Sequence, residues 1–345
     1  MIKNYCIKNG KIRFYMYIIL FVLPILCSLI AINMGRMSID FKDIFLFIGD
    51  LLNGLETDPI IESVILNLRL PRIITAIIVG GGLTIAGITF QSVFSNPLAT
   101  PDILGVSSAA SLGAVIAIIL SMGSVGIQVI ALATGLSSIF LTLRIIKREE
   151  SSIIMLVLAG IIVSSLANAF SSLLKYTADP MDKLPQITYW LMGSFGRASY
   201  KNLFIAAPVI IISVILIYKM RWQLNILTLS EDEIKSMGVN VKKTRFIFLF
   251  LSTLITASSV SICGQIGWIG LIIPHLCRML VGGNNLYIMP FGISIGASFM
   301  ILIEALSRTV SVIELPISIL TAIIGAPIFI MLLRKTGGIF RWNYV

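Results

Sequence analysis

The 345-residue sequence has few charged residues, which make up 12% of it, whereas hydrophobic residues make up 57%. A water-soluble globule of this composition would expose too much apolar surface, so the sequence predicts a polytopic membrane protein. The net charge of +10 suggests nucleic acid at first sight. The basic residues, however, lie in short segments between apolar runs, where they act as topology signals. Nucleic-acid binding is therefore not expected.

Catalytic and metal-binding motifs are missing as well. The only histidine, His275, lies in an apolar segment without a carboxylate in helical reach, which favours a packing role. No G-x4-G-K-[ST] phosphate loop, GxSxG or HExxH motif occurs. We therefore expect no enzymatic activity, no metal site and no cofactor bound by this chain. Four cysteines form no CxxC pair and are expected to be free core thiols, namely Cys6, Cys27, Cys263 and Cys277.

Ionisable side chains are nearly absent from the interiors of the apolar runs. An ion-coupled secondary transporter usually needs such groups, or broken helices that face a site at the bilayer midplane. Their absence favours a transporter that receives its energy from another protein. An ion-coupled transporter and a membrane scaffold that moves nothing remain alternatives, and an intramembrane enzyme is the least favoured class.

Ten apolar segments predict an all-α bundle of ten transmembrane helices that forms a single domain over residues 1–345. Lys and Arg gather in the connections of one side, so both termini are expected in the cytoplasm. Residues 41–52 predict a helix on the outer membrane surface, and residues 187–195 are too short to span and are expected at the interface. The ten segments are 14–32, 73–94, 103–120, 127–146, 153–174, 203–218, 246–263, 266–281, 287–303 and 317–333.

Small residues recur at a spacing of four in several of these segments. Examples are Gly80 and Thr84 in the second segment and Gly292 and Gly296 in the ninth. In lipid this spacing lets helix backbones approach closely, so it predicts helix packing. The glycine-rich run at 264–270 is a weak helix start and predicts either a hinge or a tight turn.

A polar stretch at 219–245 interrupts the apolar pattern. Ser230 and Glu233 form a capping box, and Gly238 is a natural helix stop. Glu231 lies in the first turn, where the helix dipole favours a negative charge. Ile234 and Met237 share one face and are expected to meet a partner protein. The region 229–241 is thus predicted to be a short cytoplasmic contact helix.

The fifth segment carries a cluster of polar residues. Two interpretations stay open, because these side chains either line a translocation pathway or form hydrogen bonds between helices. The residues are Ser164, Ser165, Asn168, Ser171 and Ser172.

Seven motifs in order along the chain give it a family resemblance. They are LRLPR at 68–72, NPLATPDILGVSSAASLGA at 96–114, LAGIIVSSL at 158–166, YWLMGSFGRAS at 189–199, SMGVNV at 236–241, GQIGWIGLIIPHLCRMLVG at 264–282 and ELPISILTAIIGAPIFIMLLRK at 314–335. The chain resembles the ten-helix permease subunit of type II ABC importers for iron-siderophores, haem and vitamin B12.

The resemblance implies a bacterial cytoplasmic-membrane permease that forms a homodimer or pairs with a closely related permease. It implies two cytoplasmic ATPase subunits that use ATP, and a substrate-binding protein outside the membrane. The expected cargo is a ferric siderophore, with haem or cobalamin as alternatives.

The resemblance also assigns roles to particular residues. Residues 230–241 would insert into a groove of the ATPase. Arg69, Arg72 and Arg308 would pair with glutamates of the binding protein. The chain departs from the usual pattern at Asn284 and Asn285, where relatives often carry Asp-His, and at Glu304, where an Asp is common.

Overall fold

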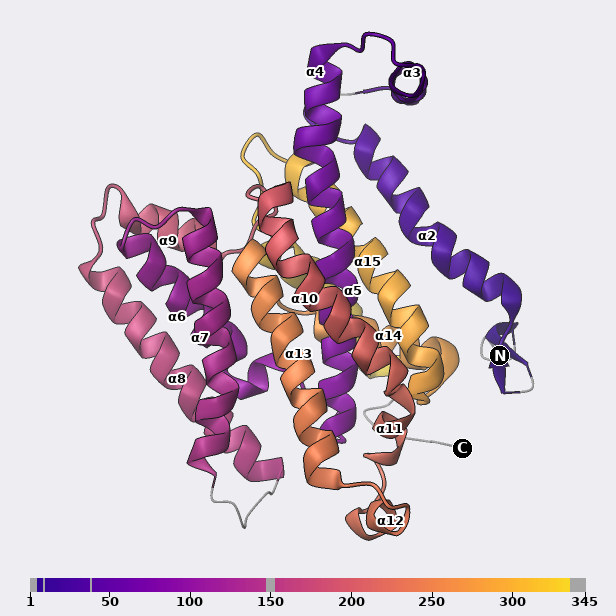
Figure 1. Cartoon of the computed structure of the whole chain (residues 1–345), viewed down its shortest axis with the longest axis vertical. Coiled ribbons are helices and arrows are strands. Elements are labelled where there is room, and N and C mark those ends of the chain that lie inside the picture. The colour runs from indigo at the N-terminus through magenta and orange to yellow at the C-terminus, as the bar shows by residue number, and fades with distance from the viewer. Residues whose placement is uncertain (1–4, 9, 38, 147–152, 336–345) are drawn as a thin grey trace.

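A computed structural model describes residues 5–8, 10–37, 39–146 and 153–335 as a bundle of roughly parallel and antiparallel helices (Figure 1). Within these residues, seven helices are long and apolar enough to cross a membrane, and three shorter apolar helices accompany them. Each of the ten predicted segments therefore forms an apolar helix, and seven of these helices are long enough to span by themselves. The long helices are α2 (Phe14–Asn33), α5 (Leu70–Val93), α7 (Ser124–Ile145), α8 (Ile153–Thr177), α10 (Tyr200–Lys219), α13 (Val241–Cys263) and α15 (Asn285–Thr309). The shorter ones are α6 (Val106–Ile119), α14 (Ile269–Val281) and α16 (Ile317–Lys335).

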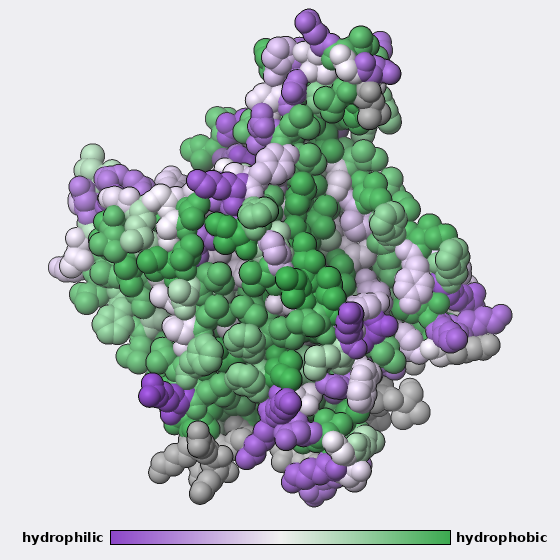
Figure 2. Space-filling model, viewed as in Figure 1, coloured by the Kyte–Doolittle hydropathy of each residue, from purple (hydrophilic) through white to green (hydrophobic). Residues whose placement is uncertain are grey.

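The surface of the bundle is apolar around its middle. Figure 2 shows a broad hydrophobic belt, with hydrophilic residues gathered towards the two ends of the molecule. Exposed Phe204, Ile212 and Leu166 belong to this surface. Such a belt is stable only against lipid chains, which confirms the predicted all-α membrane bundle.

The end of the bundle that is expected to face outside, called the outer end below, carries elements that do not cross it. The helix α3 (Phe41–Asn53) stands beside α4 (Pro59–Glu62) at the top of Figure 1. The π-helix η1 (Ser63–Arg69) joins α4 to α5, so the second helix begins well before the predicted residue 73. Pro71 is compatible with this extension because it occupies the first turn of α5, where a missing N–H breaks no bond within that helix.

The helix α9 (Lys183–Leu191) lies across the outer ends of its neighbours. The ammonium group of Lys183 donates to the Ser121 hydroxyl over 2.8 Å, and the Ser194 amide donates to the Cys263 carbonyl over 2.8 Å. Trp190 and Ile187 of α9 are buried against the bundle. The chain thus enters and leaves this segment at the same end of the bundle, and the prediction that it does not cross is confirmed.

The opposite end, which is expected in the cytoplasm and is called the inner end below, gathers the described residues before α2 and the polar stretch. A small antiparallel hairpin of β1 (Ile7–Lys8) and β2 (Lys11–Ile12) lies there, which the sequence did not predict. The Tyr287 hydroxyl at the start of α15 donates to the Gly10 carbonyl over 2.6 Å. The start of α15 also contacts α11 (Arg221–Ile226), because the backbone N–H of Asn285 donates to the side-chain oxygen of Asn225 over 2.8 Å. The hairpin, α11 and α12 (Glu231–Ser236) therefore share one end.

Two connections reach into the middle of the bundle. The connection between the predicted segments 73–94 and 103–120 contains η2 (Pro101–Leu104), which lies against α8. Gly105 follows with φ +74°, and a Cβ atom there would come within 3.0 Å of the Ser164 amide nitrogen. On the other side, α14 begins deep in the bundle, where Gly270 lies against Gly87 of α5. The glycine-rich run at 264–268 is therefore a non-helical segment that leads to this buried helix start.

The helix α5 is the most enclosed of the long helices, and α15 packs closely against it. A Cβ atom on Gly296 would lie 2.7 Å from the Gly80 carbonyl oxygen, and a Cβ atom on Gly80 would overlap the Gly296 carbonyl oxygen. The predicted small-residue packing is confirmed between these two helices.

We predict that Gly80→Ala destabilises the protein by about 1–3 kcal/mol, because the new methyl group overpacks the contact between α5 and α15. Thermal unfolding in lipid nanodiscs measures the effect. Gly49→Ala on the exposed helix α3 is the matched control, since its Cβ atom would meet nothing within 4 Å. Both changes gain helix propensity, so equal effects would contradict the packing account.

Candidate functional site

The predicted contact helix is present as α12, at the tip of the bundle below α11 and α13 (Figure 1). The Ser230 amide donates to the Glu233 carboxylate over 3.0 Å, and the Glu233 amide donates to the Ser230 hydroxyl over 3.5 Å. Two hydrogen bonds lower the pKa of the Glu233 carboxylate below its usual range. The larger effect comes from the Ser230 hydroxyl and the smaller from the Ser230 backbone N–H. Gly238 ends the turn with φ +73°, so the capping box and the stop are both confirmed.

The two apolar residues of α12 do not share an accessible face. Ile234 is 1% exposed and packs into the core of this chain, whereas Met237 is 57% exposed. The prediction that both meet a partner is therefore wrong for Ile234, because the short helix uses that side chain to anchor itself. Glu231 begins α12, but its side chain lies outside the part of the chain that the structure describes. Ser230, Glu233, Met237 and Gly238 remain accessible.

The polar cluster of α8 is divided between two environments. Ser165, Asn168 and Ser172 are exposed, Ser164 is half-buried and Ser171 is buried. The three exposed residues recur at helical spacing and form a polar stripe on a helix whose other exposed residues before Tyr176 are apolar. Such a stripe in a membrane span faces water or another protein and not lipid chains.

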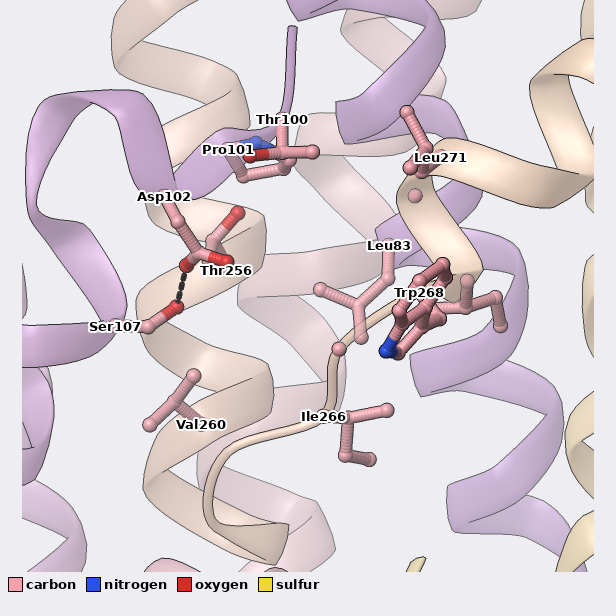
Figure 3. A pocket seen from close by; sticks show the side chains of 13 residues that line it. Leu83, Thr100, Pro101, Asp102, Ser107, Thr256, Val260, Ile266, Trp268 and Leu271 are labelled. Carbon is pink, nitrogen blue, oxygen red and sulfur yellow. Dashed lines mark hydrogen bonds between the residues drawn. The ribbon is translucent and has the colours of Figure 1, made fainter. Parts of the chain in front are cut away.

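Asp102 is an ionisable residue that the sequence did not place inside the bundle. Its carboxylate accepts a hydrogen bond from the Ser107 hydroxyl (Figure 3). It lies in η2 near Thr256 of α13, and Leu83 of α5 lines the same cavity. Both helices are long enough to cross a membrane, so Asp102 lies beside membrane-spanning segments, with its side chain exposed in this chain. Asp102 lies in the connection just before the predicted segment 103–120, where an acidic residue is ordinary and does not indicate a functional site.

The cavity at Asp102 lies between η2 and the start of α14. Trp268 closes one side of it and has φ +69°, an uncommon conformation for a bulky residue. Two helix starts inside a membrane are the arrangement that transporters use around a central pathway. The cavity holds about 30 Å³, about the room of one water molecule, so a cargo molecule does not fit there in this conformation.

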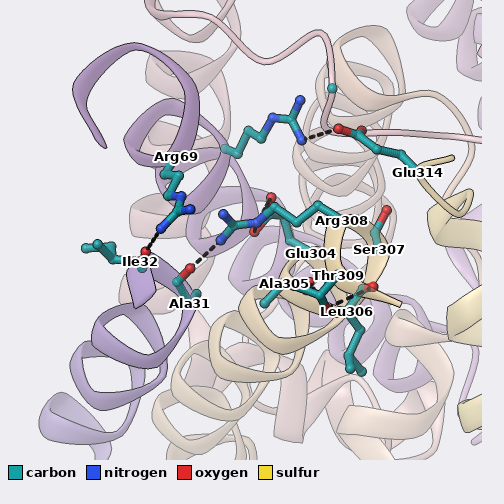
Figure 4. Close-up of polar contacts among 12 residues, drawn as sticks. Ala31, Ile32, Arg69, Glu304, Ala305, Leu306, Ser307, Arg308, Thr309 and Glu314 are labelled. Carbon is teal, nitrogen blue, oxygen red and sulfur yellow. Dashed lines mark hydrogen bonds and ion pairs between the residues drawn. The ribbon is translucent and has the colours of Figure 1, made fainter. Parts of the chain in front are cut away.

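The three arginines predicted to dock a partner line one cavity at the outer end, and Figure 4 shows Arg69 and Arg308 there. Arg69 donates to the carbonyl groups of Ile32 and Met37, and Arg308 donates to that of Ala31. These carbonyls lie at or beyond the C-terminal end of α2, where the helix leaves acceptors unsatisfied. Arg69 is 4% exposed and Arg308 is 6% exposed, so both guanidinium groups are largely covered.

Two glutamates balance part of this charge. Glu304 pairs with Arg308 over 3.1 Å, and Glu314 pairs with Arg72 over 2.8 Å. The Arg72 side chain keeps 16% of its surface exposed and Glu314 keeps 33%. Although Glu304 stands where relatives often have an aspartate, it still supplies a carboxylate that pairs with Arg308.

A cavity of about 190 Å³ opens over this cluster and includes Arg36, which the sequence reasoning missed. Arg36 is exposed and donates to the Val312 carbonyl. Its place in a polar connection before the outer helix α3 gave no signal beyond charge. Four arginines and one glutamate line the cavity, so the outer mouth is positively charged.

The inner end contains a neutral polar cluster around Asn284 and Asn285, where the chain departs from the usual Asp-His of the family. Asn225 of α11 donates to Asn284 over 2.8 Å, and the Asn285 amide donates back to Asn225 over 2.8 Å. The Ser92 hydroxyl at the end of α5 donates to the Asn285 side chain over 3.2 Å. These asparagines connect the segment before α12 to α15 and α5.

A ten-helix apolar bundle with a capped helix at one end, a basic mouth at the other and no phosphate loop is a membrane permease. The sequence model of the FecCD transport family matches residues 22–335. The chain belongs to this family of ABC importer permeases, which transport their cargo without hydrolysing ATP themselves.

Individual relatives cover nearly the whole chain. The molybdate import system permease protein of Haemophilus influenzae is 41% identical over 91% of this chain and 94% of the relative. A probable iron chelatin transport system permease protein of Helicobacter pylori is 34% identical over 81% of this chain and 85% of the relative. A solved structure described as an inward-facing conformation of a putative metal-chelate type ABC transporter matches with a TM-score of 0.85 and 37% identity. That match covers 93% of this chain and 99% of the other. These matches favour the permease over the ion-coupled and scaffold alternatives.

Proposed function

We propose that this chain is the permease subunit of an ABC importer that takes up a metal-containing compound, with a ferric siderophore as the first candidate. The observation that carries the proposal is α12, an exposed and capped helix held at one end of a bundle that lacks its own phosphate loop. Two ATPase subunits bind there and drive alternating access. The partner must bind one state of the bundle more tightly, because contact alone shifts no equilibrium.

The proposed assembly places α12 and both termini in the cytoplasm of a bacterial cell. A second copy of this chain, or a closely related permease, completes the pathway, and a substrate-binding protein docks at the outer end. The shared end of the N-terminal hairpin and α12, together with the basic connections there, supports this orientation.

Movement at α12 reaches the bundle through the asparagine contacts. Ile234 fixes α12 to the core, and Asn225 links the preceding helix to the start of α15. Asn285 in turn accepts from Ser92 at the end of α5. Neutral hydrogen bonds suit this position, because they can exchange partners without leaving a charge unpaired in a low-dielectric environment.

The translocation pathway runs along the polar stripe of α8. Ser165, Asn168 and Ser172 supply uncharged hydrogen-bonding groups, and η2 with Asp102 lies beside the middle of this helix, where Gly105 contacts Ser164. Ser164 and Ser171, which are less exposed, position the stripe. The uncharged side chains of the stripe bind a bulky complex weakly enough for it to be released on the other side.

The cargo has a second candidate. Identity to the molybdate permease, 41%, exceeds the 34% identity to the iron chelatin permease, so a molybdate-type oxyanion is the alternative that a specific observation favours. Haem and cobalamin complete the range of cargo expected from the sequence.

We expect vesicles that contain this chain with its ATPase and binding protein to accumulate a ferric siderophore only when ATP is present inside. Uptake of radioactive iron and of radioactive molybdate, measured in parallel, separates the two candidate cargoes. Molybdate uptake without iron uptake would replace the siderophore by an oxyanion. Uptake by this chain alone under an ion gradient would contradict the importer proposal.

We predict that Met237→Glu lowers uptake at least tenfold, because a charge enters the apolar contact with the ATPase, while the helix itself stays anchored by Ile234. Uptake and ATP hydrolysis are measured together, and hydrolysis should no longer respond to loaded binding protein. Met181→Glu is the control, since this methionine is 90% exposed near α9 at the opposite end. Normal uptake by the Met237 variant would show that the coupling assignment is wrong.

Docking of the binding protein is proposed at the basic cavity over Arg69, Arg72 and Arg308. We predict that Arg72→Gln weakens binding about tenfold at low salt, because Glu314 then lies unpaired and repels an acidic partner. Arg69 and Arg308 are unsuitable for this test, since their loss would also release the end of α2. The control Lys201→Gln removes an exposed charge outside the cavity. Equal, salt-independent affinities for both variants would argue against docking here.

A further inference from the structure

A second outer cavity, of about 320 Å³, shares no lining residue with the arginine cavity. Its walls come from the first turns of α7 and α10, from α9 and from the outer ends of α6 and α13. Gln186, Arg197 and Asn202 make one part of the lining polar, and Ile118, Trp190 and Ile262 make another part apolar. The cavity is therefore amphipathic and stands apart from every site described above.

A buried side-chain oxygen of the cavity lining, on Asn202, lacks a hydrogen-bond donor among the described residues, and so does one on Gln128 behind the lining. Asn202 is 6% exposed and donates to the Arg197 carbonyl over 3.1 Å, but its own side-chain oxygen has no partner in the described part of the chain. Gln128, 1% exposed, donates to the Asn202 carbonyl over 3.0 Å and also has an unpartnered side-chain oxygen. Unpaired buried acceptors are costly, so the site calls for a ligand with N–H or O–H groups.

The same cavity offers positive charge without a counter-ion. Arg197 lines it, and among the described residues its guanidinium group forms no hydrogen bond and no ion pair. Gly123, which precedes α7, provides no side-chain cap, and Ser124 of the first turn lines the cavity. The start of α10 lies at the same place through Asn202. The Ser199 side chain already caps α10, so the guanidinium group and the uncapped N-terminus of α7 are the features that favour an anion.

The flanks of the cavity place it where lipid headgroups lie. Both α7 and α10 expose most of their surface, with Val129 50% exposed and Phe204 83% exposed close to their outer ends. Tyr200 and Lys201 are exposed at the start of α10, as is typical of a membrane interface.

We propose that this cavity binds a phosphate group that carries N–H or O–H donors, as the headgroup of phosphatidylethanolamine or phosphatidylglycerol does. Arg197 and the first turn of α7 bind the phosphate oxygens, and Asn202 accepts the donor. The apolar wall receives the adjoining lipid chain. Monohydrogen phosphate from solution has the same chemistry, so the test separates the two sources.

The test uses the full chain purified in detergent and compares lipid binding by native mass spectrometry. We expect Arg197→Gln to retain about tenfold less phosphatidylethanolamine than the unchanged protein, and Arg197→Lys to retain most of it. Lys201→Gln, with the same charge loss outside the cavity, should bind normally. Because Arg197 is exposed, neither substitution at it disturbs the core.

Two further arms decide the source and the role of Asn202. Phosphatidylcholine has no N–H donor and should bind less well than phosphatidylethanolamine; equal binding would overturn the role of Asn202. A thermal shift by inorganic phosphate that Arg197→Gln abolishes, without any lipid difference, would assign the site to free phosphate. If neither lipid binding nor the phosphate shift depends on Arg197, the proposal is wrong.

Discussion

Close contact between glycine backbones around α5 is the constraint on which the rest of this structure depends. Lipid supplies no hydrophobic force between helices, so van der Waals contact must hold the bundle together. Gly80 meets α15, Gly82 meets α10 and α13, and Gly87 meets the start of α14. The helix α5 is therefore an axis with neighbours on several faces.

Both ends of this axis carry the polar contacts that matter for function. At the outer end, Arg69 holds the end of α2 and Arg72 pairs with Glu314. At the inner end, Ser92 bonds to Asn285 next to α11. The charged side chains at the outer end bind groups that we propose stay in place. The hydrogen bonds between Ser92, Asn285 and α11 are neutral and lie where the proposed movement occurs. A buried charge that lost its partner would be strongly destabilising, so the charged end suits a fixed scaffold.

Much of this arrangement could be predicted from the sequence because its signals are local. Apolar length gave the ten spans, and the Ser230 and Glu233 pair gave the start of α12. Other features depend on tertiary contacts that no local pattern encodes. Ile234 is buried because α12 folds back against the bundle, and Asp102 lies beside the long helices because η2 packs on α8. The burial of Arg69 depends in the same way on where α2 ends.

The central claim is that energy enters this chain through α12, and crosslinking from Met237 tests it most directly. All four native cysteines are buried, so a cysteine introduced at Met237 would be the accessible thiol among the described residues. With a thiol-reactive photocrosslinker, the account predicts a product with the ATPase whose yield changes when ATP binds, and none from a cysteine at Met181. Equal or absent crosslinking from both positions would contradict it.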